Sequence, residues 1–165
     1  MGERRLLSEE YRMPATPLHR LVYSSTYRTG RIDNELLALR DILSQSRKNN
    51  QKSEITGYLM FDGESFVQVL EGPRESVEAT MARIAQDERH RDVTIIAIKP
   101  TESRAFHNWT MGGYRRSAEQ DPIFRAHGIP GQIDRAQLSF DTVVSLAIAL
   151  GADQAKRASS SSNTP

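Results

Sequence analysis

Hydrophobic and polar residues alternate in short strand-like stretches, separated by longer stretches with helical spacing, between residues 18 and 116. The strand-like stretches are rich in β-branched and aromatic residues. They are Leu18–Ser25, Ile55–Phe61, Ser65–Leu70, Val93–Lys99 and a short one at Trp109–Tyr114. The second and third are joined at Asp62-Gly63, a pair typical of a tight hairpin. The pattern therefore predicts five strands, two of which form a hairpin.

Two amphipathic helices are expected between these strands. The first has its cap at Asp33 and runs to about Asn49, with leucines spaced to form one apolar face. The second opens at Gly72-Pro73, since proline suits the first helical position, and ends near Asp87.

The predicted order β-α-β-β-α-β, followed by one more strand, is typical of an α+β fold with a ferredoxin-like sheet. Both helices would then cover one face of the sheet. A later apolar helix, from about Ser139 to Leu150, is the candidate to cover the other face.

Composition outside this region suggests four zones along the chain. Residues 1–17 are polar and predict an N-terminal extension, and residues 18–116 form the main domain. Residues 117–151 predict a C-terminal helical extension. Residues 152–165 end in a serine-rich run and predict a disordered tail.

Charge and cysteine content exclude several functional classes. Formal net charge is +1, so nucleic-acid binding through a basic surface is not expected. The sequence has no cysteine, which excludes disulfides, thiolate metal sites and cysteine nucleophiles. No apolar run approaches the ~20 residues that span a bilayer, and the N-terminus does not resemble a signal peptide. We therefore expect a cytoplasmic protein without a membrane partner.

Two polar residues occupy strand positions where the pattern favours apolar ones. Gln68 shares a predicted buried row with Phe66 and Leu70, and Tyr23 lies on the neighbouring first strand. A buried amide without hydrogen-bond partners costs about 1–3 kcal/mol, so something must satisfy Gln68. Either Tyr23 and Gln68 bond each other or the backbone, or they line a pocket whose ligand completes their bonds.

Other candidate residues have ordinary structural explanations when taken singly. Asn49 and Asn50 are residue types that often occur at the end of a helix. Asp87, Arg89 and His90 are typical of a charged helix end that is exposed to solvent. Trp109 and Met111 suit a core or an interface. The four histidines lack metal-ligand spacing, so no metal site is expected, and neither a phosphate-binding glycine loop nor a GxSxG motif is present.

Taken together, several segments closely resemble the BLUF family of flavin-based blue-light sensors. The segments are LHRLVYSS at 18–25, SRKNN at 46–50, ITGYLMFDGESFVQVLEGP at 55–73, RIAQDERH at 83–90 and FHNWTMGGY at 106–114. The resemblance implies non-covalent binding of FAD, with FMN or riboflavin as other possible flavins, between the two helices on one face of a ferredoxin-like sheet.

The resemblance also implies roles for individual residues. Tyr23 matches the tyrosine that donates an electron and a proton, and Gln68 the glutamine between it and the flavin. Trp109 and Met111 match the pair associated with signal output, which completes the expected photocycle group. Flavin contacts are implied for Tyr23, Asn49, Asn50, Phe66, Gln68, Arg83, Asp87, Arg89, His90 and Met111.

The function predicted in this way is light sensing without catalysis, passed to a separate signalling protein or to another subunit of a homo-oligomer. Two alternatives use the same fold. An acylphosphatase-like hydrolase would need an anion-binding loop after the first strand, where Arg28 is the one supporting residue. A ligand- or RNA-binding regulatory domain would need exposed aromatic residues and a basic face, and neither is evident.

Overall fold

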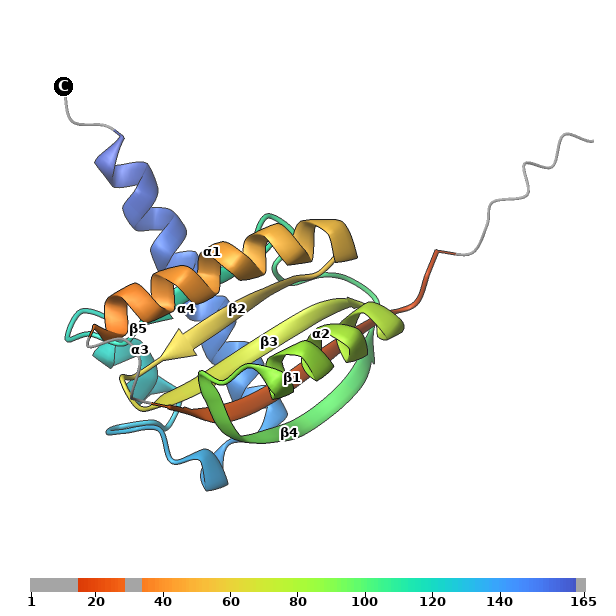
Figure 1. Cartoon of the computed structure of the whole chain (residues 1–165). Helices are drawn as coiled ribbons and strands as arrows, with labels where there is room; N and C mark the ends of the chain where they lie inside the picture. Colours follow the sequence, from red (N-terminus) through yellow and green to blue (C-terminus); the bar gives the residue numbers. More distant parts are fainter. Residues whose placement is uncertain (1–14, 29–33, 163–165) are drawn as a thin grey trace, which may run out of the picture.

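The computed structural model describes residues 15–28 and 34–162, and Figure 1 shows a twisted sheet with helices on both sides. The sheet has the strand order β4-β1-β3-β2-β5, antiparallel throughout except that β5 runs parallel to β2. The strands are β1 (Leu18–Tyr27), β2 (Thr56–Phe61), β3 (Ser65–Pro73), β4 (His90–Thr101) and β5 (Gly112–Arg115). The helices are α1 (Glu35–Ser53), α2 (Arg74–Gln86), α3 (Asp121–Ala126) and α4 (Phe140–Ser161). The predicted ferredoxin-like α+β fold is confirmed.

Each face of the sheet has its own hydrophobic core. On one face, α1 and α2 pack side chains such as Leu39, Ile42 and Val77 against the strands. On the other face, α4 contributes Val143, Leu146 and their neighbours. Figure 1 shows α1 and α2 in front of the sheet and α4 behind it. The prediction that the last helix covers the second face is thus confirmed.

Helix α1 differs from its prediction at both ends. Its capping side chain is that of Asn34, which accepts hydrogen bonds from the amides of Leu36 and Leu37. Asp33, the expected cap, lies outside the described residues. The helix continues to Ser53, where Glu54 takes a left-handed conformation (φ 56°). Asn49 and Asn50 are therefore inside its last turns.

Several strand boundaries also differ from the prediction. Strand β3 extends to Pro73, so this proline caps α2 and the helix begins at Arg74. Strand β4 begins at His90 and is irregular: its register with β1 shifts twice, and Asp92 has a positive φ of 51°. Strand β5 begins at Gly112, so Trp109 and Met111 come before it.

Helix α4 is longer than expected, and the prediction of a disordered segment from residue 152 is wrong as far as Ser161. Arg157 pairs with Asp153 one turn earlier, at 2.8 Å. The hydroxyl groups of residues 159–162 donate to carbonyl oxygens four residues before them. The serine hydroxyls are thus satisfied within the helix itself. Residues 163–165 and 1–14, parts of the predicted tail and extension, lie outside the described residues.

The close packing of β2 on β3 gives a test of the fold. A methyl group at Gly57 would lie 2.0 Å from the backbone oxygen of Val69, which cannot move without breaking the sheet. We expect Gly57→Ala to lower the free energy of unfolding by about 2–3 kcal/mol, measured by chemical denaturation. Gly131→Ala is the control, because nothing lies within 4 Å of the added atom. Equal stability of the two variants would contradict this packing.

Candidate functional site

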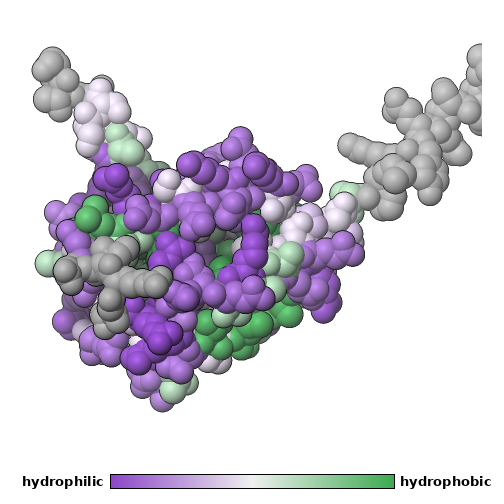
Figure 2. Space-filling view, in the orientation of Figure 1, coloured by the Kyte–Doolittle hydropathy of each residue, from purple (hydrophilic) through white to green (hydrophobic). Residues whose placement is uncertain are grey.

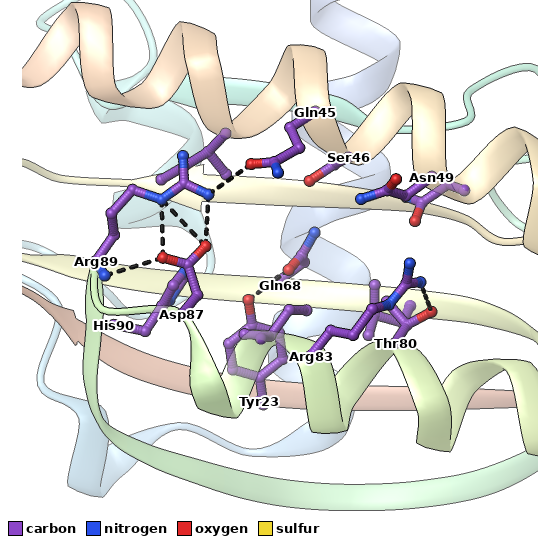
Figure 3. Close-up of a pocket in the computed structure, with 14 residues that line it drawn as sticks. Tyr23, Gln45, Ser46, Asn49, Gln68, Thr80, Arg83, Asp87, Arg89 and His90 are labelled. Carbon is purple, nitrogen blue, oxygen red and sulfur yellow. Dashed lines mark hydrogen bonds and ion pairs between the residues drawn. The ribbon is translucent and has the colours of Figure 1, made fainter.

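A cavity opens between α1 and α2, above the middle of the sheet (Figure 3). Tyr23 and Gln68 form its floor, α1 supplies one wall, and α2 with the following turn supplies the other. Eight of the residues predicted from the sequence line it: Tyr23, Asn49, Asn50, Gln68, Arg83, Asp87, Arg89 and His90. Residues far apart in the sequence are therefore brought to one site.

The floor of the cavity is a buried hydrogen bond between Tyr23 and Gln68, which are direct partners across β1 and β3. Their exposed fractions are 0% and 3%. Burial raises the pKa of the Tyr23 phenol above its usual range, and the nearby charge of Asp87 raises it further. The phenol thus stays protonated and donates to Oε1 of Gln68. The first alternative left open by the sequence is confirmed, since the pair is bonded together. The pair also lines a cavity, and completion of its bonds by a ligand stays a prediction.

The other end of the Gln68 amide points to Met111. Nε2 of Gln68 donates to the Met111 sulfur at 3.0 Å. This orientation follows from the Tyr23 bond, because an amide whose oxygen accepts from the phenol turns its nitrogen the other way. Of the two candidate output residues, Met111 is the one beside the glutamine.

Trp109 lies with the core on the α4 side of the sheet. Its ring stacks on Tyr58, with the ring centres 5.3 Å apart, and an added methyl group at Gly151 of α4 would lie 3.2 Å from it. Trp109 therefore sits between the sheet and α4, and Met111 two residues later belongs to the opposite core.

Two predicted flavin contacts are not in the cavity lining. Phe66 is fully buried behind it, stacked on Phe61 and next to His90. Met111 is also buried, and Gln68 lies between its sulfur and Tyr23. Both residues support lining side chains in this structure. Their predicted contact with a ligand stays untested.

Helix α1 contributes residues that the sequence reasoning missed. Arg47 donates through Nε to the carbonyl oxygen of Met111 at 3.0 Å, and Asn50 donates through Nδ2 to that of Thr110 at 2.9 Å. The two lie one helical turn apart, on the same face of α1. That spacing within SRKNN places Arg47 on the face of Asn50, but it gives no sign of a backbone partner in a distant segment. Gln45, Ser46 and Thr80 also line the cavity and were not predicted.

Charged residues border the cavity at two places, with Asp87 and Arg89 at one end and Arg83 on the side of Thr80 and Asn49 (Figure 3). Arg89 pairs with Asp87 and also donates to Oε1 of Gln45 on α1, at 3.0 Å. Burial tends to raise the pKa of Asp87, but hydrogen bonds and charge from Arg89 hold it below its usual range. Arg83 extends from α2 and donates to Thr80 (Figure 3). Two guanidinium groups thus border the site.

A family model described as sensors of blue light using FAD matches residues 18–112. The chain belongs to the BLUF family. BLUF proteins are blue-light sensors that bind a flavin, so this chain is a blue-light flavin sensor, as its sequence predicted.

Curated BLUF relatives include proteins with different outputs. The blue light- and temperature-regulated antirepressor BluF of Escherichia coli K12 is 30% identical over 122 residues, covering 73% of this chain and 29% of the relative. The photoactivated adenylate cyclase subunit beta of Euglena gracilis is 38% identical over 76 residues, 46% of this chain and 9% of the relative. The chain thus matches less than a third of the length of either protein.

Two solved BLUF structures are similar over most of the chain. The photo-activated state of BlsA has a TM-score of 0.71 and 26% identity, covering 81% of this chain and 94% of that one. The dark state of the BLUF protein BlrB has a TM-score of 0.63 and 27% identity, with 81% and 98% covered. Within the described ranges, no helix has the length and hydrophobicity needed to span a membrane. The expected cytoplasmic location stays a prediction.

The chemistry of the cavity fits a flavin. A flat ring with alternating carbonyl and imide groups along one edge needs apolar walls and amide partners. Ile42, Leu70 and Ile84 provide apolar surface, while Asn49, Asn50 and Gln68 provide amides. The guanidinium groups of Arg83 and Arg89 suit an anionic side chain.

The buried His90 generates a prediction about pH. Burial lowers its pKa to about 4, although the charge of Asp87 opposes the shift, and its Nδ1 lies 2.8 Å from the Ser25 hydroxyl. The unfolded chain therefore binds a proton at His90 between about pH 6.5 and 4, and the folded one does not. Stability must fall as the pH is lowered through this window.

We expect His90 to reduce the free energy of unfolding by about 2 kcal/mol between pH 7 and pH 5. His90→Gln should remove that part of the pH dependence while keeping a polar group near Ser25. Denaturant titrations of both proteins at the two pH values measure the difference. An identical pH dependence in the two proteins would show that His90 is not held neutral.

Proposed function

We propose that this BLUF chain records blue light by reversing the hydrogen bonds of Gln68, with Tyr23 as the electron and proton donor. The observation that carries the proposal is the buried bond from Tyr23 Oη to Gln68 Oε1 on the floor of the cavity. The bound flavin, proposed to be FAD, supplies light absorption and an acceptor for the electron and proton. The family description, which names FAD, supports this choice.

The residues around the cavity divide into holding and responding groups. Asn49 and Asn50 are proposed to bind the polar edge of the ring. Arg83, Asp87 and Arg89, which line the cavity, are proposed to bind the flavin side chain. Tyr23 and Gln68 respond to light, because they alone join a proton donor to an amide on the cavity floor.

In the proposed reaction, Tyr23 loses an electron and then its Oη proton, which passes by way of Gln68 Oε1. When both return to Tyr23, the Gln68 amide is left rotated or tautomerised. No covalent record is needed, and none through a thiol is possible, because the chain has no cysteine. An amide suits this role because one end donates and the other accepts.

A reversed amide would change the contact with Met111. The thioether sulfur accepts a hydrogen bond weakly and donates none, so an oxygen facing it would lose the present bond. We propose that Met111 and Trp109 then shift, and that α4 receives the change through Trp109 and Gly151. A bias of about 1–2 kcal/mol would change the balance between two states severalfold.

The output is proposed to be altered association with a separate signalling protein or between copies of the chain, without catalysis by the chain itself. Relatives that carry the same domain include an antirepressor and photoactivated cyclase subunits. They support the proposal that the domain controls effectors of different kinds.

Tyr23→Phe tests the donor. The variant should bind flavin yet show no lasting red shift in a light-minus-dark absorption spectrum, because the phenolic proton is gone. Tyr58→Phe is the matched control, since its hydroxyl bonds to Gln154 on the other face of the sheet, and it should respond like the wild type. A persistent red shift in Tyr23→Phe would refute the donor assignment.

Met111→Leu tests the output route. The spectral shift should remain, because Tyr23 and Gln68 are unchanged, but the light-dependent change in amide hydrogen exchange of α4 should disappear. Exchange measured by mass spectrometry in the dark and under illumination checks this. A light-dependent change in α4 as large as in the wild type would rule out Met111 as the link.

A further inference from the structure

Glu71 is a fully buried carboxylate that has no part in the proposed light reaction. It lies on β3, three residues after Gln68. Side chains alternate along a strand, so Gln68 faces the cavity and Glu71 faces the α4 side. An ionised carboxylate in such a place must be paired and hydrogen-bonded to be tolerated.

The partners of the Glu71 carboxylate come from three parts of the chain, and the longest of these contacts is that of the Thr56 hydroxyl on β2, at 3.5 Å. Arg20, its direct neighbour on β1, donates through Nε and Nη2 at 2.9 and 2.7 Å. The amides of Ala105 and Phe106 donate at 2.9 and 2.8 Å. These two belong to the connecting segment, residues 102–111, which joins β4 to β5. Glu71 therefore ties the middle of the connecting segment to the sheet.

The connecting segment is also held at Arg104, whose guanidinium donates to the Thr56 hydroxyl and to the carbonyl oxygens of Glu71 and Glu54. A further attachment lies at residues 109–111. Gly57 donates its amide to the Trp109 carbonyl, Asn50 and Arg47 bond the next two carbonyls, and Gln68 bonds the Met111 sulfur. Only the last of these contacts depends on which way the Gln68 amide points. A change at Gln68 therefore enters the connecting segment at Met111.

We propose that Glu71 is a positioning residue for the light response: it anchors the connecting segment at Ala105 and Phe106, so that a displacement of Met111 is confined to residues 107–111 and must move Trp109. This inference rests on the proposed function. Two charge-assisted bonds to consecutive amides, backed by a buried ion pair, hold more strongly than one bond to a thioether. The contact between Gln68 and Met111 therefore changes, whereas the bonds from Glu71 to Ala105 and Phe106 stay in place.

The anchor also sets the lifetime of the lit state. With residues 105–106 fixed, displacement of Met111 strains a short stretch of backbone, and relief of that strain favours return to the dark arrangement. Without the Glu71 anchor, the displacement spreads back over residues 105–111 as far as Arg104, Trp109 stays in place, and return is slower.

Glu71→Gln tests the inference, because an amide keeps the shape but has a single oxygen for the two backbone donors. In the dark, exchange of the Ala105 and Phe106 amides should accelerate. After illumination the red shift should still form, but dark recovery should slow by roughly tenfold. The light-minus-dark change in tryptophan fluorescence should disappear, and Trp109 is the only tryptophan in the chain.

Asp121→Asn is the control, since Asp121 pairs with Arg116 and Arg125 away from the connecting segment. It removes an ion pair but should leave the recovery rate and the Trp109 signal as in the wild type. If the single Glu71 variant does not fold, Glu71→Gln combined with Arg20→Met removes both charges and is measured instead.

The outcomes separate the two proposals. Suppose that the wild-type chain responds to light, and that the Glu71 variant has the same dark-recovery rate and the same Trp109 fluorescence change as Asp121→Asn. This result would overturn the role of Glu71 as an anchor but not the proposed function. A wild-type chain that binds flavin but shows no red shift would overturn the proposed function, and the role of the anchor with it.

Discussion

One buried hydrogen bond between β1 and β3 determines the arrangement of the site. Tyr23 and Gln68 are partners in the antiparallel register, so the sheet itself sets their separation. Burial keeps the phenol protonated, so that it can donate to Oε1 of Gln68. The direction of that bond in turn decides which end of the amide faces Met111. The direction of one hydrogen bond is thus linked to the positions of Tyr23 on β1, Gln68 on β3 and Met111 in the segment before β5.

The sheet separates the cavity from α4, and the connecting segment reaches both sides. Met111 packs in the core beneath α1 and α2, while Trp109, two residues earlier, packs in the core beneath α4. Figure 2 shows the outer surface over the helices as mostly polar, with an apolar area near β4 and α2. The connecting segment thus places one side chain in each of the two cores.

Much of the fold and the centre of the site could be predicted from the sequence, because they rest on local patterns. The Asp62-Gly63 turn determines the β2–β3 hairpin, and the misplaced polarity of Gln68 marks the cavity floor. Arg47 and Glu71 could not be placed in the same way. Both are polar residues whose partners are backbone groups of a distant segment, and such partners leave no periodic signal.

The ends of elements were predicted least well, and the reasons are physical. Helix α4 continues past residue 152, where Arg157 pairs with Asp153 one turn earlier. Strand β5 starts late, since the ring of Trp109 fills the space beside Gly112, where a methyl group would lie 2.0 Å from it. The helix and strand propensities of single residues do not include these contacts between side chains.

The irregular outer strand β4 has a consequence for how copies of this molecule can meet. Its unpaired backbone is interrupted where the register with β1 shifts, and Asp92 turns the chain there with a positive φ. Bulges of this kind spoil the even spacing that another strand needs in order to add on. Addition of a strand from another copy at the β4 edge is thereby disfavoured.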